Sequence, residues 1–188
     1  VSRAAAQRHV AAHGVRRARR ARRAPPGGVY ARSAIMVDPL TGRVLYEKNS
    51  GQSAPIASLT KLMTALVFLE QTPDLSRSAE VTRDELFGGG HTQLRNHEIV
   101  ELGDLFHMSL MCSDNVATRV IARESGLSHQ EFLARMNKKA RELGLAETRF
   151  VEFTGLDERN VSTAADVARL LQAAANQDRI HDITTTRT

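Results

Sequence analysis

The stretch PIASLTKLMTALVFLE, residues 55–70, decides the fold because it predicts a helix with apolar residues on most of its surface. We expect this helix to run from about Ile56 to Gln71, since Pro73 prevents its continuation. Lys61 lies in the first turn, three residues after Ser58. Burying a lysine is costly, so either its amine reaches water or its burial serves a purpose.

Ser58 and Lys61 are spaced for chemistry, because residues i and i+3 of a helix share a face. Free N–H groups in the first turn favour negative charge that develops on a serine oxygen. Burial lowers the pKa of a lysine, and a neutral amine can take the proton of a neighbouring hydroxyl. On its own the spacing is weak evidence, since Ser-x-x-Lys is expected about once by chance in a chain of this length, and lysine stems often reach water.

A second polar motif lies in MSLMCSDNVAT, residues 108–118, where Ser113-Asp114-Asn115 joins two predicted helices. In an extended segment residues i and i+2 point the same way, so we expect Ser113 and Asn115 to face one cleft. A hydroxyl there can relay a proton, and a carboxamide can bind a substrate amide. The simpler interpretation is that these residues cap the following helix, and the two interpretations are compatible.

Composition predicts a single globular domain preceded by a basic tail. The 188 residues are 41% hydrophobic and the net charge is +5, but residues 1–37 contain nine arginines and no acidic residue. We expect residues 1–32 to be a disordered basic tail and residues 33–188 to be the domain. No aromatic residue lies among the arginines of VRRARRARRAPPGG, residues 15–28, which weakens the case for single-strand nucleic-acid binding and leaves anionic polymers or lipid headgroups as the alternative partners of the tail. The single cysteine, Cys112, is expected to be buried.

The remaining pattern predicts a helix-rich α/β chain. SAIMVD and RVLYEK flank PLTG and predict a hairpin, residues 72–102 are expected to be irregular, and the only clear strands are those at the front. A lone hairpin is marginally stable, so the predicted sheet is incomplete. Helices are expected at residues 103–111, 113–126, 128–144 and 162–177, the third with a Ser128–Glu131 capping box.

Ser58-x-x-Lys61 followed by Ser113-Asp-Asn115 resembles penicillin-binding proteins and serine β-lactamases. VDPLTGRVLYEKN, MNKKARELGL and TRFVEFTGLDERNVSTAADVARLL are similar to low-molecular-mass D-alanyl-D-alanine carboxypeptidases and endopeptidases. The resemblance covers residues 33 to about 185. It implies the β-lactamase/transpeptidase-like α/β fold, in which a helical cluster packs on an antiparallel sheet.

The resemblance implies a serine-type peptidase that acts on peptidoglycan through an acyl-enzyme. Ser58 attacks the carbonyl between two D-alanines, Lys61 is the general base, Ser113 passes the proton to the leaving group and Asn115 holds the substrate amide. The Ser58 N–H forms half of the oxyanion hole. No metal or organic cofactor is implied.

The implied partners are stem peptides that end in D-Ala-D-Ala or contain DD-crosslinks, with β-lactams as covalent inhibitors. The implied location is extracytoplasmic, either periplasmic or facing the cell wall, and membrane association is left open. Carboxypeptidase and endopeptidase activity are both compatible with the motifs, although PIASLTKLMTA and NVSTA favour the endopeptidases.

The family's third motif, Lys-Thr/Ser-Gly, is absent, since no lysine follows Lys139 and Phe153-Thr154-Gly155 lacks the cation. We therefore expect a chain truncated before that strand, with the C-terminal strands of the sheet missing and with weakened catalysis and stability.

Two alternatives remain open. A class A β-lactamase needs a Glu-x-x-x-Asn pattern, which Glu142, Glu147 and Glu152 do not provide. A non-catalytic cell-wall-binding fragment would fit the missing motif, but it has no need of a serine beside a buried amine.

Overall fold

The computed structural model describes residues 28–186, and residues from Ala31 onward form one compact unit. The predicted basic tail lies almost entirely outside the described residues. The strands are β1 (Ala34–Val37), β2 (Val44–Lys48), β3 (Ala54–Pro55), β4 (Ser78–Glu80), β5 (Ile99–Glu101) and β6 (Val161–Ser162). The helices are the 3₁₀ turn η1 (Ala57–Leu59), α1 (Thr60–Glu70), α2 (Arg83–Leu86), α3 (Leu102–Met111), α4 (Asn115–Arg123), α5 (His129–Glu142), α6 (Ala164–Ala175) and α7 (Asp178–Thr184).

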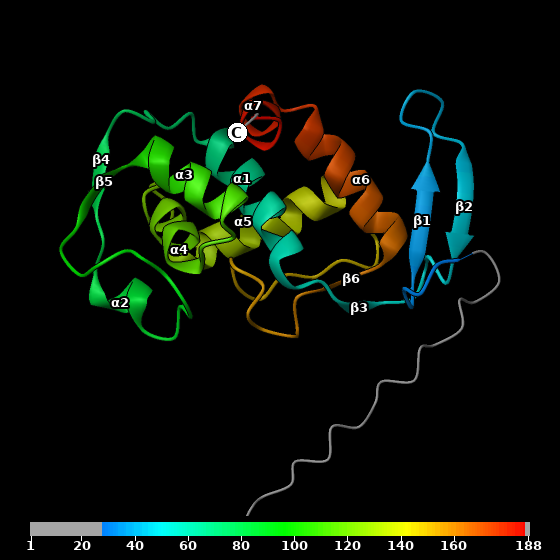
Figure 1. Ribbon diagram of the computed structural model, residues 1–188, viewed down its shortest axis with the longest axis horizontal. Coiled ribbons are helices and arrows are strands. Elements are labelled where there is room, and N and C mark those ends of the chain that lie inside the picture. Colours follow the sequence, from blue (N-terminus) through cyan, green and yellow to red (C-terminus); the bar gives the residue numbers. More distant parts are fainter. Residues whose placement is uncertain (1–27, 187–188) are drawn as a thin grey trace, which may run out of the picture. The chain divides into compact units, whose positions relative to one another are not determined.

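Within the described residues the strands form three antiparallel pairs, β1–β2, β3–β6 and β4–β5 (Figure 1). The predicted hairpin is confirmed, and Gly42 adopts a φ of 70° in its turn, where its N–H bonds the Asp38 carbonyl at 2.9 Å. Our expectation that residues 72–102 are irregular was wrong, because β4, α2 and β5 lie there. These elements have three or four residues each, too few to show a period in the sequence.

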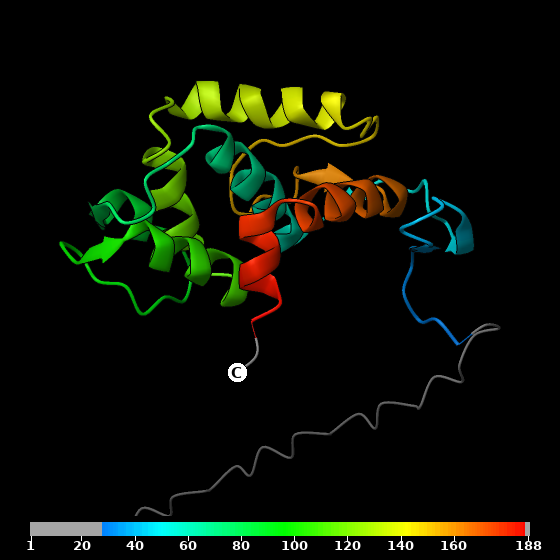
Figure 2. The same cartoon turned by 90° about the horizontal axis from the view of Figure 1, so that it is seen from above.

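The core is built around α1, which contacts α3, α4, α5 and α6. Met63, Val67 and Phe68 are fully buried, and the Phe68 ring lies 5.7 Å from that of Phe106 in α3. Figure 2 shows the helices gathered around α1, with the β1–β2 hairpin at one end of the unit beside α6. The hairpin is less well covered, since Met36 and Leu45 are more than half exposed. No helix within residues 28–186 has the length and apolar character required to cross a bilayer.

Capping residues fix where the helices begin. The predicted Ser128–Glu131 capping box is confirmed at α5, and the Thr163 side chain accepts the Asp166 N–H at the start of α6. The first predicted helix is divided, because a 3₁₀ turn containing Ser58 precedes α1. Cys112 is exposed, contrary to our expectation, because it lies past the end of α3 where the chain turns away from the core.

Candidate active site

The 3₁₀ turn and the start of α1 bring Ser58 and Lys61 together. Ser58 is exposed, whereas Lys61 is only 2% exposed. The Lys61 Nζ lies 3.2 Å from the Ser58 Oγ. The lysine therefore does not extend to water, and its amine ends against the hydroxyl of a solvent-accessible serine.

Three acceptors surround the Lys61 amine. Besides Ser58 Oγ, the Nζ donates to Asn115 Oδ1 at 2.7 Å and to the Thr154 carbonyl at 2.8 Å. An ammonium has three N–H donors, so these acceptors satisfy it. A neutral amine has two donors and a lone pair. If it keeps the two shorter bonds, its lone pair faces Ser58 Oγ.

Burial lowers the pKa of Lys61 from 10.5 to about 8, although the negative charges of Glu152 and Asp114 oppose this shift. At pH 7 about one lysine in ten is then neutral, against about one in three thousand at the ordinary pKa. A neutral amine able to accept a proton is therefore present near neutral pH, and the three acceptors stabilise the charged form.

Asn115, the first residue of α4, hydrogen-bonds both Lys61 and the loop that contains Gly89. Its Oδ1 accepts from Lys61, and its Nδ2 donates to the Gly89 carbonyl at 2.9 Å. Gly89 permits this approach, since a Cβ there would lie 2.7 Å from Val116 Cγ2. Asn115 retains one N–H and one lone pair, so it still has the donor and acceptor needed for a substrate amide.

Asp114 caps α4, as the simpler interpretation of the Ser-Asp-Asn motif proposed. Its Oδ1 accepts the Ala117 N–H at 2.9 Å, and its Oδ2 accepts the Thr92 hydroxyl at 2.7 Å. Ser113 is exposed and has a φ of 55°, so the segment is not extended and the alternation that we assumed does not apply. Ser113 is not among the three acceptors of the Lys61 amine.

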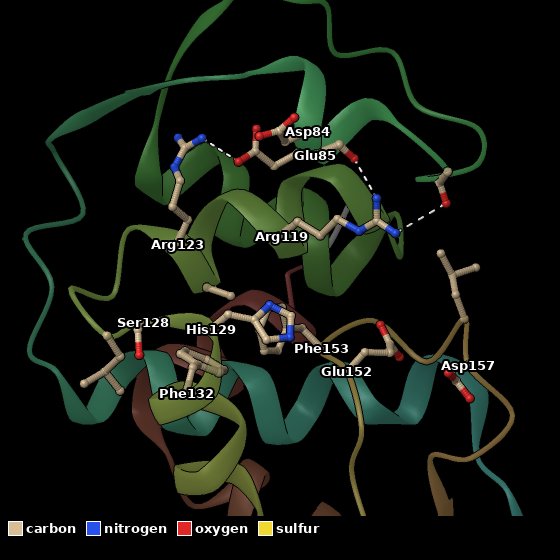
Figure 3. Close-up of a pocket in the computed structure, with 14 residues that line it drawn as sticks. Asp84, Glu85, Arg119, Arg123, Ser128, His129, Phe132, Glu152, Phe153 and Asp157 are labelled. Carbon is tan, nitrogen blue, oxygen red and sulfur yellow. Dashed lines mark hydrogen bonds and ion pairs between the residues drawn. The ribbon is translucent and has the colours of Figure 1, made fainter.

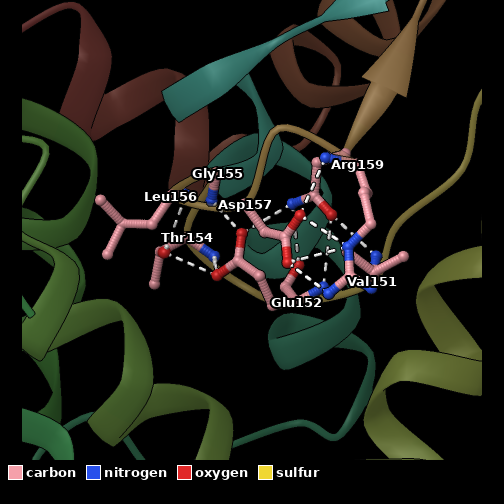
Figure 4. Close-up of polar contacts among 8 residues, drawn as sticks. Val151, Glu152, Thr154, Gly155, Leu156, Asp157 and Arg159 are labelled. Carbon is pink, nitrogen blue, oxygen red and sulfur yellow. Dashed lines mark hydrogen bonds and ion pairs between the residues drawn. The ribbon is translucent and has the colours of Figure 1, made fainter. Parts of the chain in front are cut away.

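Figure 4 shows the tight turn formed by residues 152–157, which we call the 152–157 turn. Its Thr154 carbonyl supplies the remaining lysine contact. The Glu152 carboxylate lies inside this turn. It accepts the Thr154 N–H at 2.7 Å, the Thr154 hydroxyl at 2.6 Å, the Gly155 N–H and the Asn160 Nδ2 at 2.7 Å. These bonds leave the Thr154 carbonyl directed at Lys61.

Gly155 packs directly against the peptide that precedes the serine. It has a φ of 91°, and a Cβ at this position would lie 1.8 Å from the Ala57 carbonyl oxygen and 2.9 Å from the Ser58 nitrogen. Only glycine fits such an approach. The turn therefore contacts both members of the Ser58–Lys61 pair.

A cavity of about 790 Å³ lies on another side of the 152–157 turn (Figure 3). Its walls come from α2, α4, the start of α5 and the turn, and include Glu85, Arg119, Arg123, His129, Phe132 and Glu152. Ser58 and Lys61 do not line it. The cavity therefore adjoins the groups that support the lysine rather than the reacting atoms.

Sequence reasoning missed three supporting residues, namely Gly89, Glu152 and Thr154. Glu152 was considered only as a β-lactamase base, and Gly155 only as part of a degenerate third motif. The one available signal was Glu152 two residues before Thr154-Gly155, since a carboxylate can bond backbone N–H groups two and three residues on. Thr154 acts through its carbonyl, for which no side-chain signal exists.

An exposed serine whose hydroxyl lies against a buried lysine defines the class of serine acyl-transfer proteins that use a Ser-Lys pair. The family model for D-alanyl-D-alanine carboxypeptidase matches residues 19–188, and the chain belongs to this family.

Two curated relatives are D-alanyl-D-alanine endopeptidases. The one from Escherichia coli is 36% identical over 157 residues, covering 82% of this chain and 51% of the relative. The one from Pseudomonas aeruginosa is 37% identical over 156 residues, covering 82% and 50%. This chain thus spans about half the length of these relatives.

Solved structures show the same fold. The D-alanyl-D-alanine carboxypeptidase from Mycobacterium tuberculosis superposes with a TM-score of 0.74 at 26% identity, over 83% of this chain and 60% of that one. The carboxypeptidase DacD from Francisella tularensis gives a TM-score of 0.77 at 24% identity, over 86% and 41%. The expected fold class, helices packed with antiparallel sheet, is confirmed.

Proposed function

We propose that this chain carries the nucleophile and the base of a serine-type D-Ala-D-Ala peptidase that works through an acyl-enzyme and is inhibited by penicillins. The observation that carries the proposal is the 3.2 Å contact between Ser58 Oγ and the buried Lys61 Nζ. A lysine with a pKa near 8 beside an accessible hydroxyl is suited to nucleophilic catalysis.

Acylation begins from neutral Lys61. Its two N–H groups stay bonded to Asn115 Oδ1 and the Thr154 carbonyl, and its lone pair takes the Ser58 proton as the oxygen attacks the carbonyl between two D-alanines. The tetrahedral oxyanion is stabilised by the Ser58 N–H, which lies in the first turn of the helical segment. The proton then passes to the leaving amine, and water later releases the acyl group.

We assign the transfer of that proton to Ser113. It is exposed, and it lies two residues before the asparagine that binds the lysine. Its hydroxyl has no protein partner among the hydrogen bonds of residues 28–186, so it is available both to donate and to accept a proton. The spare N–H and lone pair of Asn115 are assigned to the substrate peptide.

The substrates we propose are peptidoglycan stem peptides that end in D-Ala-D-Ala or carry DD-crosslinks, and the proposed location is extracytoplasmic. Relatives named endopeptidases are 34–37% identical to this chain, and relatives named carboxypeptidases are 30–34% identical. The higher identity to the endopeptidases favours cleavage of DD-crosslinks over removal of a terminal D-alanine. The Lys-Thr/Ser-Gly motif, which the resemblance implies for the other wall of the cleft, does not occur in residues 28–186.

The β-lactamase alternative needs a carboxylate that activates the deacylating water. Glu152 lies in the 152–157 turn near Lys61, but four donors occupy its carboxylate. A carboxylate with all its lone-pair sites in use is a poor general base. This observation favours slow deacylation, which is the behaviour of a penicillin-trapped peptidase.

Intact-mass spectrometry after incubation with benzylpenicillin tests the proposal. We expect one covalent adduct per chain, and none with Ser58→Ala. The same measurement on a longer chain that includes a Lys-Thr-Gly strand separates a missing cleft wall from a wrong mechanism. No adduct on either folded chain would contradict the proposal and favour a non-catalytic cell-wall-binding protein.

A further inference from the structure

The mechanism above gives no role to the half-buried carboxylate of Glu152. Glu152 is directed into the 152–157 turn, and its charge acts on Lys61. We propose that Glu152 is a positioning residue for the Ser58–Lys61 pair, because its carboxylate holds the turn that presents the Thr154 carbonyl to the lysine and supports the peptide before the serine. This inference rests on the proposed roles of Ser58 and Lys61.

The Glu152 carboxylate accepts four hydrogen bonds that hold the turn. Two of its four donors are backbone N–H groups, those of Thr154 and Gly155, and the other two are the Thr154 hydroxyl and the Asn160 amide. A carboxylate offers about four lone-pair sites, so all are used. Hydrogen bonds to an ionised acceptor are roughly twice as strong as neutral ones, which makes this turn rigid.

Asn160 ties the turn to the start of α1. Its Nδ2 also donates to Thr60 Oγ1 at 3.1 Å, and its carbonyl accepts the Ile56 N–H at 3.1 Å. Thr60 precedes Lys61, and Ile56 lies two residues before Ser58. Asn160 therefore links the Glu152 carboxylate to the residue directly before Lys61 and to a residue two positions before Ser58.

Two successive carbonyls of the turn contact one face of α1. The Phe153 carbonyl accepts the Thr64 hydroxyl at 2.6 Å, and the Thr154 carbonyl accepts the Lys61 amine at 2.8 Å. Both depend on the conformation that Glu152 imposes, because its bonds to the Thr154 and Gly155 N–H groups fix the intervening peptides. Without the carboxylate, the acceptor that holds the lysine is no longer fixed.

Glu152 also acts on Lys61 through charge. Burial lowers the lysine's pKa, while the charges of Glu152 and, to a smaller extent, Asp114 raise it. Asp114 reaches the site from the start of α4 and Glu152 from the turn, and these are the two acids whose charges act on the amine. Removing the Glu152 charge is expected to lower the midpoint at which Lys61 loses its proton.

A titration of the Lys61 side chain by ¹³C NMR tests this inference on the intact chain. The sequence has four lysines, Lys48, Lys61, Lys138 and Lys139, so signals can be assigned by single substitutions. We expect the Glu152→Gln variant to titrate about one pH unit below the wild type. Glu158→Gln, which removes an exposed charge from the same loop, is the matched control and is expected to leave the midpoint unchanged.

A second variant separates position from charge. Glu152→Asp keeps the charge but shortens the arm, so we expect a nearly unchanged midpoint and acylation by benzylpenicillin slower by about tenfold or more. An unchanged midpoint in Glu152→Gln, or wild-type acylation in Glu152→Asp, would overturn the inference. If Glu152→Gln does not fold, Glu152→Asp decides alone. Failure of the wild-type chain to acylate counts against the proposed function, whereas the lysine titration still measures the effect of Glu152.

Discussion

The Cα of Gly155 lies against the carbonyl of Ala57, so closely that a methyl group on Gly155 would sit 1.8 Å from that oxygen. Ala57 itself has a φ of 46°, in the left-handed region that non-glycine residues rarely occupy. Two unusual backbone conformations thus meet one residue before the proposed nucleophile. Such strain is maintained only when the surrounding structure holds it.

Gly155→Ala is therefore expected to abolish acylation. The new methyl group must displace the Ala57–Ser58 peptide, which carries the N–H that we propose for the oxyanion hole, and an error of about 1 Å there costs on the order of 100-fold in rate. Gly126→Ala is the matched control, because Gly126 has a φ of 81° but no atom within 4 Å of an added Cβ. The control should lose about 1 kcal/mol of stability and keep its acylation rate. Equal rates for the two variants would contradict the packing argument.

Gly89→Ala is expected to disturb the site from the opposite side. An added Cβ would lie 2.7 Å from Val116 Cγ2 and 2.9 Å from the Glu85 carbonyl, so the loop must shift. That shift withdraws the Gly89 carbonyl from Asn115 Nδ2 and frees the amide that orients Lys61. Acylation should slow by roughly tenfold, measured by stopped-flow or mass spectrometry.

Gly51→Ala is the comparison for this effect, since nothing lies within 4 Å of a Cβ at Gly51 and its φ is outside the left-handed region. It should acylate like the wild type. If Gly89→Ala does so too, the loop is not a support of the site.

The Ser58–Lys61 pair and the hairpin were predictable because local patterns specify them. A lysine in an apolar helical turn three residues after a serine is visible in the sequence, and so is a Pro-Gly turn between β-rich runs. The Ser128 capping box was predictable for the same reason, since both of its hydrogen bonds join residues three apart.

The supports of the site were not predictable, because they depend on contacts between distant residues. Asn115 is 54 positions from Lys61, and the Thr154 carbonyl is 93 positions away. The left-handed conformation of Ser113 likewise follows from how α3 ends and α4 begins, which a rule for extended segments cannot anticipate. The pairing of β3 with β6 joins segments of two residues, too short to show a period.

Asp114→Ala is expected to destabilise the protein by about 1–2 kcal/mol through loss of the α4 cap. The Ala117 N–H loses its side-chain acceptor, and the Thr92 hydroxyl loses the carboxylate to which it donates. Urea unfolding followed by circular dichroism measures the change. Asp178→Ala, at the exposed start of α7, is the comparison and should change stability by less than about 0.5 kcal/mol. Equal losses of stability for the two variants would mean that the Asp114 cap stabilises the protein no more than an exposed acidic residue at the start of α7.

Lys61→Met is expected to show a stability difference from the wild type that depends on pH. The pKa of Lys61 is about 8 when folded and near 10.5 when unfolded. Between these values the unfolded wild type binds more protons than the folded form, so its free energy of unfolding rises with pH. Well below pH 8 both forms carry the Lys61 charge, and the full cost of burying that charge opposes folding.

The methionine variant lacks this titration. From pH 8 to 9.5 the wild type should therefore gain about 1.6 kcal/mol relative to Lys61→Met. Urea unfolding at pH 7, 8, 9 and 9.5 measures this gain as a change in the difference between the two proteins, so other groups that titrate in both cancel. Lys138→Met, at a lysine whose side chain is 66% exposed, provides the control and should differ from the wild type by the same amount at every pH. A pH-independent difference for Lys61→Met as well would mean that the amine is not desolvated, and the basis for a neutral lysine near pH 8 would fail.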